Sequence, residues 1–445
     1  MSEGGLGAPE RHNIRWRDDD YYNADMLDVE MRRVFDICHG CRRCFNLCDS
    51  FPKLFDLIDE SETEELDSVR SEDFKPIVDA CTLCDMCFMV KCPYVPPHEF
   101  DLDFPHLMLR YRAVQLKDGK TPSIRRQLTE TDRNGKLGCS ASKLVNWASS
   151  TANSLTRPLM QGVMGIDKNA VLPKFNSKPL SKRNEPLSIN ADAPAYGRKA
   201  VIYSTCTSEY NTADLGLAAA EVLARNGVET LFVYPGCCGM PQLEHGDIGR
   251  VAHAAKKIAA EMVGWIDKGY DVISPVASCS LMLKFEWPLI EPEDENVKKL
   301  SRATFDVSEY LIDISSNEGI APGLKPIDGG ITLHIACHAR AQNMGRKGAD
   351  MLKLIPNTQV NVIERCSGHG GSWGIMKNNF ETALKVGKPV ARDTAKKAAR
   401  FVVSECLLAQ DHILQGVERL DTENPTSNTE QVKHPIELMA ISYKE

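Results

Sequence analysis

The sequence of 445 residues lacks several features that would assign it to common classes of protein. No apolar run reaches the ~18 residues of a membrane-spanning helix, and the first twenty residues hold no apolar signal region, so we expect a cytoplasmic protein. A net charge of −8 argues against a nucleic-acid-binding protein. The absence of G-x-G-x-x-G and G-x-x-x-x-G-K-[ST] motifs gives no sign that the chain binds its own flavin, nicotinamide or nucleotide.

Cysteine, by contrast, is abundant, with sixteen in the chain. Eight lie in two short runs before residue 93, Cys139 stands alone, and seven are spread from Cys206 to Cys406. In a reducing compartment such cysteines indicate metal ligation or redox chemistry rather than disulfides. Cys139 has no partner at ligand spacing, and we interpret it as a buried structural thiol.

The two early runs have the spacing of iron–sulfur ligands. The first is C-x2-C-x2-C-x3-C and the second is C-x2-C-x2-C-x4-C followed by proline. In two-cluster ferredoxins the fourth cysteine of each run binds the other cluster. We therefore predict two [4Fe-4S] clusters, one on Cys38, Cys41, Cys44 and Cys92 and the other on Cys81, Cys84, Cys87 and Cys48. Zinc is the alternative, although its four ligands usually come as two separated pairs.

The flanks of these runs read as helices. Apolar residues recur at roughly helical spacing before the first run, at Met26, Val29, Val34 and Ile37, and "DFKPIVDA" and "FPHLMLRYRAVQL" surround the second. This pattern resembles the α-helical ferredoxin module of respiratory iron–sulfur subunits. It departs from the compact ferredoxin pattern at Asp49, where proline is usual, and by an extra residue before Cys92.

Three basic residues, Arg42, Arg43 and Lys91, lie among the thiols in the sequence. They either raise the cluster potentials by offsetting anionic charge or are solvated surface residues.

From residue 198 short apolar runs alternate with helical patterns, and this order occurs twice. Each run predicts a buried parallel strand, and each is followed by cysteine: Cys206, Cys237–Cys238 and Cys279 in the first copy, and Cys337, Cys366 and Cys406 in the second. The cysteine steps are 31 and 42 residues in the first copy and 29 and 40 in the second. These matching intervals indicate an internal duplication, with the cysteines at the sheet edge where ligands bind.

The motifs "CCGMPQLEHGDI", "SCSLMLKFEWP", "CHARAQNMG" and "ERCSGHGGSWG" resemble the cysteine-rich (CCG) domain family. This family includes heterodisulfide reductase and the C subunits of anaerobic glycerol-3-phosphate dehydrogenases. The resemblance brings an expectation from the heterodisulfide reductase branch of the family. In that branch, five thiolates of a C…CCG…CxxC motif hold a noncubane [4Fe-4S] cluster. This chain has Val276 and Val403 in place of one cysteine of each CxxC, and Ser367 beside Cys366.

The first copy keeps four thiols, Cys206, Cys237, Cys238 and Cys279, which is the number for one further [4Fe-4S] cluster. The second keeps three, Cys337, Cys366 and Cys406. Either this copy has an unusual fourth ligand, or it has lost its cluster. The candidates for that ligand are His338, Ser367 and His369.

The predicted fold is α+β overall, with an N-terminal α-helical ferredoxin domain followed by duplicated α/β CCG domains with parallel sheets. The predicted bounds are an extension at 1–29, the ferredoxin domain at 30–117, a wrapping connector at 118–197, and CCG copies at 198–327 and 328–445. For the connector we expect one helix, in "SKLVNWASSTANSL".

The leading functional hypothesis is an iron–sulfur electron-transfer subunit of a multisubunit oxidoreductase. A flavoprotein dehydrogenase or another redox protein would be its partner, and quinone at the cytoplasmic face of the membrane or another redox protein its acceptor. The alternatives are a CCG site that itself reduces a disulfide or peroxide-type substrate, and a redox-sensing or structural iron–sulfur protein.

Overall fold

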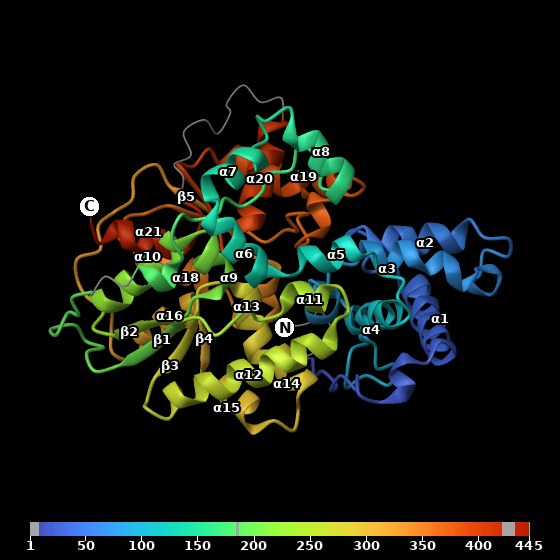
Figure 1. Cartoon of the computed structure of the whole chain (residues 1–445), viewed down its shortest axis with the longest axis horizontal. Coiled ribbons are helices and arrows are strands. Elements are labelled where there is room, and N and C mark those ends of the chain that lie inside the picture. The colour runs from blue at the N-terminus through green and yellow to red at the C-terminus, as the bar shows by residue number, and fades with distance from the viewer. Residues whose placement is uncertain (1–8, 184–186, 421–431, 445) are drawn as a thin grey trace. The chain divides into compact units, whose positions relative to one another are not determined.

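The computed structural model describes residues 9–183, 187–420 and 432–444, which fall into two compact units (Figure 1). Unit 1 consists of residues 1–129 and 239–253, and unit 2 of residues 130–238 and 254–445. Small parts of the predicted extension, connector and second copy, at 1–8, 184–186, 421–431 and 445, lie outside the described residues.

The described part of unit 1 contains helices, turns and irregular segments and no strand. Its helices are α1 (Ala24–Cys41), α2 (Ser50–Asp59), α3 (Lys75–Ala80), α4 (Phe104–Lys117), α5 (Ser123–Leu128) and α11 (Met240–Glu244). Aromatic side chains form much of the core, with the Phe35 and Phe74 rings 5.0 Å apart and those of Phe51 and Phe104 4.7 Å apart.

The apolar face that we predicted for α1 is only partly correct. The buried residues of α1 are Leu27, Met31, Val34 and Phe35, whereas Met26 and Val29 are exposed. Of the two neighbouring apolar stripes on this helix, the one containing Phe35 is buried because it packs against α2 and α4.

The first CCG copy is a parallel sheet in the order β2-β1-β3-β4. Its strands are β1 (Lys199–Tyr203), β2 (Glu229–Val233), β3 (Asp271–Ser274) and β4 (Thr304–Asp306). Its helices are α9 (Thr205–Tyr210), α10 (Ala213–Arg225), α12 (Ile248–Ile266), α13 (Ala277–Leu281), α14 (Trp287–Ile290), α15 (Glu295–Ala303) and α16 (Val307–Asn317). Strands β1 and β3 are buried beyond their first residues because both faces of the sheet are covered there, whereas β2 is only partly buried.

The second copy repeats this arrangement with the order β6-β5-β7, so that the first strand of each copy is central. Its strands are β5 (Ile331–His334), β6 (Val360–Ile363) and β7 (Phe401–Ser404). Its helices are α17 (Cys337–Ala341), α18 (Lys347–Leu352), α19 (Phe380–Lys397), α20 (Leu407–Glu418) and α21 (Pro435–Ser442). The predicted duplication of an α/β unit is confirmed at the level of the fold.

The two copies interlock through their last helices. Each of these helices, α16 and α21, begins with a capping box, formed by Asp306 with Glu309 and by His434 with Glu437. Helix α16 of the first copy packs on α18 of the second, and α21 of the second copy packs on α10 of the first.

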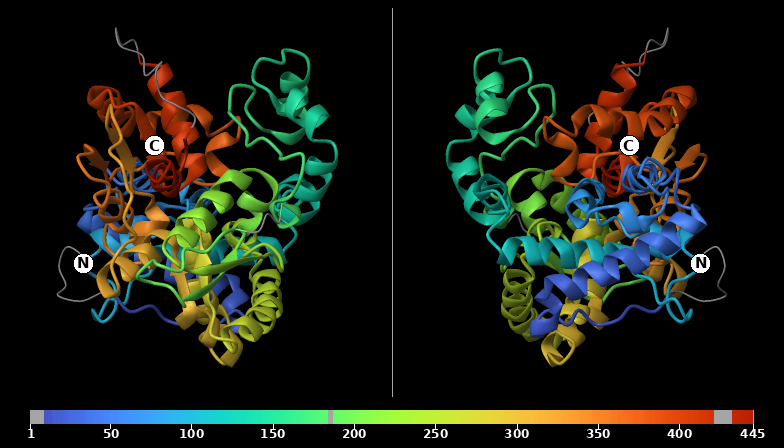
Figure 2. Two further views of the ribbon diagram at one scale, coloured as in Figure 1. Left: turned by 90° about the vertical axis from the view of Figure 1, so that its left-hand side faces the viewer. Right: turned by 90° about the vertical axis from the view of Figure 1, so that its right-hand side faces the viewer.

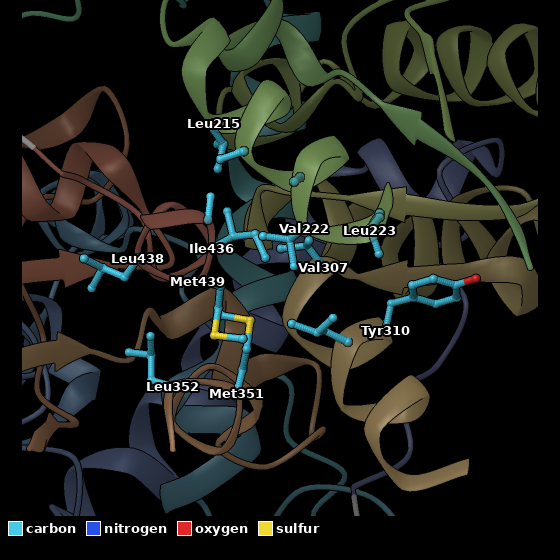
Figure 3. Close-up of a cluster of buried hydrophobic side chains, with 14 of the residues drawn as sticks. Leu215, Val222, Leu223, Val307, Tyr310, Met351, Leu352, Ile436, Leu438 and Met439 are labelled. Carbon is cyan, nitrogen blue, oxygen red and sulfur yellow. The ribbon is translucent and has the colours of Figure 1, made fainter. Parts of the chain in front are cut away.

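One apolar core therefore runs through both copies (Figure 3). In Figure 3, Leu215 and Val222 of α10 lie near Ile436 and Met439 of α21, and Met351 of α18 lies below Met439. Leu215, Val222, Met351, Ile436 and Met439 are all fully buried. The burial of such side chains is the main term stabilising unit 2.

The connector contains more helix than the sequence predicted. Besides α5 and the expected α7 (Ser142–Ser149), its described part forms α6 (Thr131–Ser140) and α8 (Thr156–Met164). Both α6 and α8 carry glycine, which lowers intrinsic helix propensity, and α6 depends on packing for its stability. Gly135, for example, lies directly against the Tyr210 ring, where a Cβ atom would approach to 2.2 Å.

Candidate metal centres

The eight early cysteines lie at helix ends and in tight turns of unit 1. Helix α1 continues through Cys38 and ends at Cys41, and a π-helical turn, Cys87–Lys91, contains Cys87. Several residues beside these cysteines have positive φ angles that non-glycine residues rarely adopt, namely Arg42 (54°), Leu83 (48°) and Asp85 (63°). Strain of this kind persists where the surroundings fix the backbone, as they do at ligand-binding turns.

The thiols of unit 1 influence the pKa values of one another. Burial raises the pKa of Cys38 well above its usual value, and the thiols of Cys92, Cys44 and Cys41 add to the rise. Burial likewise raises the pKa of Cys87, and here the added contributions come from Cys84, Cys44, Cys81 and Cys48. The structure thus brings Cys38 near three thiols of its predicted set, and Cys87 near the three other thiols of its own set and near Cys44 of the first set.

Arginines hold the second thiol turn in place. Arg11 donates two hydrogen bonds to the Asp85 carboxylate, at 2.8 and 3.1 Å, and another to Asp103 at 2.7 Å. Arg112 donates to the carbonyls of Val78 and Cys81. Arg11 and Arg112 are functional candidates that the sequence did not reveal, because both are distant from the cysteine runs.

The three basic residues of the cysteine runs have different environments. Arg42 is paired with the Asp59 carboxylate and stacks on the Phe55 ring, 5.3 Å from its centroid. Burial raises the pKa of Cys44 to about 12, while Lys91 and Arg43 act in the opposite direction. The charges of Arg43 and Lys91 therefore lower the pKa of the Cys44 thiol, whereas the charge of Arg42 is balanced by the Asp59 carboxylate.

In unit 2, the sheet of the first copy brings four thiols to its carboxyl edge. Cys206 lies in the first turn of α9, Cys237 and Cys238 follow β2, and Cys279 lies in α13 after β3. The Sγ atoms of Cys206 and Cys237 are 3.8 Å apart, and those of Cys238 and Cys279 are 3.3 Å apart. Cys237, Cys238 and Cys279 are buried, and Cys206 is partly buried.

The residues directly before Cys206 and Cys237 have positive φ angles. Thr205, before Cys206, has φ 57°, which is rare for a β-branched residue. Gly236 has φ 152°, so the turn that precedes the paired cysteines requires glycine.

The environment of the four thiols suits a positively charged iron–sulfur core. A hydrogen bond to Cys237 and burial raise the pKa of Cys206, and hydrogen bonds to Cys237 and Cys279 together with burial raise that of Cys238. Thiolates so close together need a nearby cation, which a metal core supplies. In the part of the chain that the structure describes, no three or more His, Cys, Asp or Glu side chains surround a single metal position. Instead, the sulfurs of the first copy contact each other in pairs.

Asp132, on α6 of the connector, reaches this site. Its carboxylate accepts a hydrogen bond from the Cys237 backbone N–H at 3.3 Å and another from the Tyr234 hydroxyl. Two further residues line the turn: Tyr203 donates to the Gly236 carbonyl at 2.6 Å, and the Trp287 indole donates to the Cys238 carbonyl at 3.0 Å. No spacing pattern in the sequence points to Asp132, because it precedes the paired cysteines by about a hundred residues.

In the second copy the thiols are less enclosed. Cys337 begins α17, Cys406 precedes α20, and both are partly buried, while Cys366, after β6, is exposed. The Cys366 turn lies directly on α19: a Cβ atom on Gly368 would approach the Ala383 carbonyl oxygen to 2.0 Å. Glycine is therefore required at position 368, which accounts for part of the "CSGHGG" sequence.

The three candidates for a fourth ligand lie in different surroundings. The His338 Nδ1 is 2.8 Å from the Ser278 hydroxyl, so it links α17 to α13, the helix that carries Cys279. The Ser367 hydroxyl accepts a hydrogen bond from the His369 backbone N–H at 3.4 Å. The His369 ring is buried edge-on to His412, with centroids 5.8 Å apart, and burial lowers its pKa to about 3.

Buried carboxyl groups lie beside the second site. Glu405, next to Cys406, accepts a hydrogen bond from the Ala336 backbone N–H at 3.1 Å. Burial, with a contribution from Asp306 of the first copy, raises its pKa to about 8. The two copies therefore adjoin near their cysteine-bearing segments.

The fold and the cysteine sites define a class of protein. Residues 200–284 and 331–408 match the family model of the cysteine-rich domain, CCG, and these segments lie within the two structural copies. The chain thus contains two CCG domains, and the resemblance inferred from the sequence is confirmed. None of the helices in the described residues has the length and apolar character needed to cross a membrane.

Relatives match over longer stretches. The chain is 26% identical over 337 residues to the C subunit of anaerobic glycerol-3-phosphate dehydrogenase from Escherichia coli K12, covering 74% of this chain and 80% of that protein. It is 27% identical over 214 residues to lactate utilization protein A of Oceanobacillus iheyensis, covering 46% and 84%. It is 28% identical over 230 residues to the B subunit of fumarate reductase (CoM/CoB) from Methanothermobacter marburgensis, covering 50% and 43%.

Proposed function

We propose that this protein is the iron–sulfur electron-transfer subunit of a multisubunit oxidoreductase. The observation that carries the proposal is the convergence of Cys206, Cys237, Cys238 and Cys279 at one sheet edge, in a chain with eight further cysteines at ferredoxin spacing. Relatives named as subunits of a dehydrogenase and a reductase support it.

Three clusters are proposed. Unit 1 is the ferredoxin module, with one [4Fe-4S] cluster on Cys38, Cys41, Cys44 and Cys92 and another on Cys81, Cys84, Cys87 and Cys48. A third is held by the four thiols of the first CCG copy. Clusters bound at these sites supply one-electron redox chemistry. The influence of the thiols on one another's pKa within each site supports the proposal, and Cys44 of the first cluster also acts on Cys87 of the second.

The protein's own residues hold the thiolates, limit access of water and set the local charge. Burial of Cys237, Cys238 and Cys279 keeps the site in low dielectric, where the Asp132 carboxylate and the backbone N–H groups act strongly. We propose a flavoprotein dehydrogenase or another redox protein as partner and quinone or another redox protein as acceptor. We further propose that the protein associates peripherally with the cytoplasmic face of the membrane.

The test is anaerobic purification with iron analysis and EPR spectroscopy of the parent and of Cys238→Ser. We expect the variant to lose or alter one cluster signal and to retain both signals from unit 1. Cys139→Ser is the matched control, since Cys139 is also buried but donates to the Tyr210 carbonyl, as a serine hydroxyl can. Unchanged iron content and spectrum in Cys238→Ser would contradict the proposed site.

A second candidate function rests on the exposure of Cys366. An accessible site with three cysteines could itself reduce a disulfide, taking two electrons and two protons to give two thiols. Turnover of a small disulfide by the isolated chain with a chemical reductant, and its loss in Cys366→Ser, would favour this alternative. The iron content of the same variant would report whether the second copy holds metal.

A further inference from the structure

Helices α7 and α8 of unit 2, with Leu155 immediately before α8, expose several large apolar side chains. The exposed fractions are 64% for Leu144, 57% for Trp147, 79% for Leu155, 66% for Leu159 and 67% for Val163. We call these five side chains the α7–α8 face. Residues spaced by three or four along a helix lie on one side of it, so each helix presents its members together. In Figure 2 the teal segment that contains both helices stands at the periphery of unit 2.

The α7–α8 face is built on a well-held framework. Arg157 of α8 is 2% exposed, and its guanidinium donates to the backbone carbonyls of Ser149, Asp167, Lys168 and Ala170. The chain that follows α8 is joined to the second CCG copy by the backbone hydrogen bonds Asp167 N to Ile375 O and Lys377 N to Gly165 O, both 2.8 Å. The apolar side chains are thus exposed from ordered helices.

The stretch of sequence that carries this face is basic, opposite in sign to the net charge of the whole chain. Residues 133–183 contain nine Lys and Arg and a single acidic residue, Asp167, whereas the whole protein has a net charge of −8. Several of these lysines are exposed, namely Lys136, Lys143, Lys168, Lys174 and Lys178. A basic surface with an apolar face and a tryptophan has the composition of elements that lie in a membrane interface.

We propose that the α7–α8 face docks the protein on the surface of a bilayer that contains anionic lipids. Leu144, Leu155, Leu159 and Val163 enter the boundary between headgroups and acyl chains, and Trp147 lies at headgroup depth. The exposed lysines of the same stretch of chain are attracted to the anionic headgroups. The proposal rests on the proposed function, in which membrane quinone is an acceptor.

The composition favours a bilayer over a protein partner. The core of a protein–protein interface is enriched in Tyr, Trp, Phe, Met and Arg and depleted of Lys. The α7–α8 face instead has four aliphatic side chains and one aromatic one, and the exposed basic residues of 133–183 are mostly lysines. A single Trp with aliphatic neighbours and flanking lysines fits the headgroup boundary better.

The test is flotation of the full-length protein with vesicles of phosphatidylcholine alone or mixed with phosphatidylglycerol. We expect the parent to float with the mixed vesicles, less at high salt, and the double variant Leu155→Glu/Leu159→Glu to bind at least about tenfold more weakly. The matched control is Val29→Glu, since Val29 is 69% exposed on a helix of unit 1, and it should float like the parent. Equal flotation of the double variant, or no flotation of the parent, would overturn the proposal.

A second measurement does not depend on the charged variants. Tryptophan emission of the parent should shift to shorter wavelength when mixed vesicles are added, and Trp147→Phe should lose that shift. An unchanged shift in Trp147→Phe would overturn the docking geometry. If the parent is a dimer and the variant Leu155→Glu/Leu159→Glu is a monomer, a second copy of the chain covers this face instead, and the bilayer proposal is overturned. Both vesicle experiments need no electron donor, so failure of the electron-transfer proposal leaves their outcome unaffected.

Discussion

At the scale of single residues, the carboxylate of Asp132 is the charged group that the structure adds to the first CCG site. Negative charge beside a cluster disfavours its reduction. We predict that Asp132→Asn raises the midpoint potential of the third cluster and leaves the iron content unchanged. EPR-monitored redox titration measures this potential. Asp192→Asn, an exposed change in the connector near the opposite end of β1, should leave it unchanged. A lower potential in Asp132→Asn would contradict the prediction.

A second prediction at this scale concerns His334 and the pH dependence of stability. Its Nδ1 lies 2.8 Å from the Ser404 hydroxyl and its Nε2 2.9 Å from the Arg365 carbonyl, and burial lowers its pKa from 6.5 to about 4. The unfolded chain therefore binds a proton between about pH 6.5 and pH 4 that the folded chain does not. Stability attributable to His334 is lost as the pH falls through this window, by at most about 1.4 kcal/mol per pH unit.

Urea unfolding of the parent and of His334→Gln between pH 7 and pH 5 measures this contribution. The free energy of unfolding should fall less steeply with acidification in the variant, since glutamine does not titrate. His253→Gln, a change at an exposed position, should keep the slope of the parent. Identical slopes in all three proteins would show that His334 does not contribute to the pH dependence.

At the scale of secondary-structure elements, the sequence predicted the strands and their cysteines well. Buried parallel strands appear as apolar runs, so β1, β2, β3, β5, β6 and β7 were recognisable, and the cysteine after each fell at the carboxyl edge. The three-residue β4 gives no such run. Helices α5, α6 and α8 of the connector were missed, α6 because packing rather than propensity stabilises it, and Asp132 of α6 was missed with it.

Helix α21 supports a prediction about stability. Met439 is fully buried between the two copies, so Met439→Ala should reduce the free energy of unfolding by about 2–5 kcal/mol. Met26→Ala is the matched control, because Met26 is 48% exposed on α1, and the change should be within about 0.5 kcal/mol. Urea unfolding of anaerobically prepared protein distinguishes the two. Equal effects would mean that α21 contributes little to the core.

At the scale of the whole molecule, the sequence indicated a helical region and a duplicated α/β region, and the structure bears out this division of secondary structure. The sequence did not indicate that the chain returns from unit 2 to unit 1 after Cys238, for residues 239–253. Contacts between segments distant in sequence determine such a return, and periodicity carries no information about them. The resemblance alone supplied the CCG family, because spacing identifies only a metal or redox site.

The packing of the last helix of each copy on the other copy, α16 on α18 and α21 on α10, predicts how the protein behaves when the chain is cut between the copies. The link between the copies has exposed residues at Asp328 and Gly329. We expect fragments 1–328 and 329–445, produced together, to co-purify as one particle, and each alone to be unstable because its partner's helix is missing. Size-exclusion chromatography measures this. A monomeric 329–445 fragment that unfolds cooperatively would contradict it.

The reciprocal packing of α16 on α18 and of α21 on α10 is the contact pattern of a two-fold symmetric homodimer. The duplicated region can thus be regarded as a dimer whose subunits have been joined into one polypeptide. In a true homodimer, both sites would have to carry the same residues. Joining the halves removes that constraint, so one site can retain four thiols while the other changes to Cys366 and Ser367.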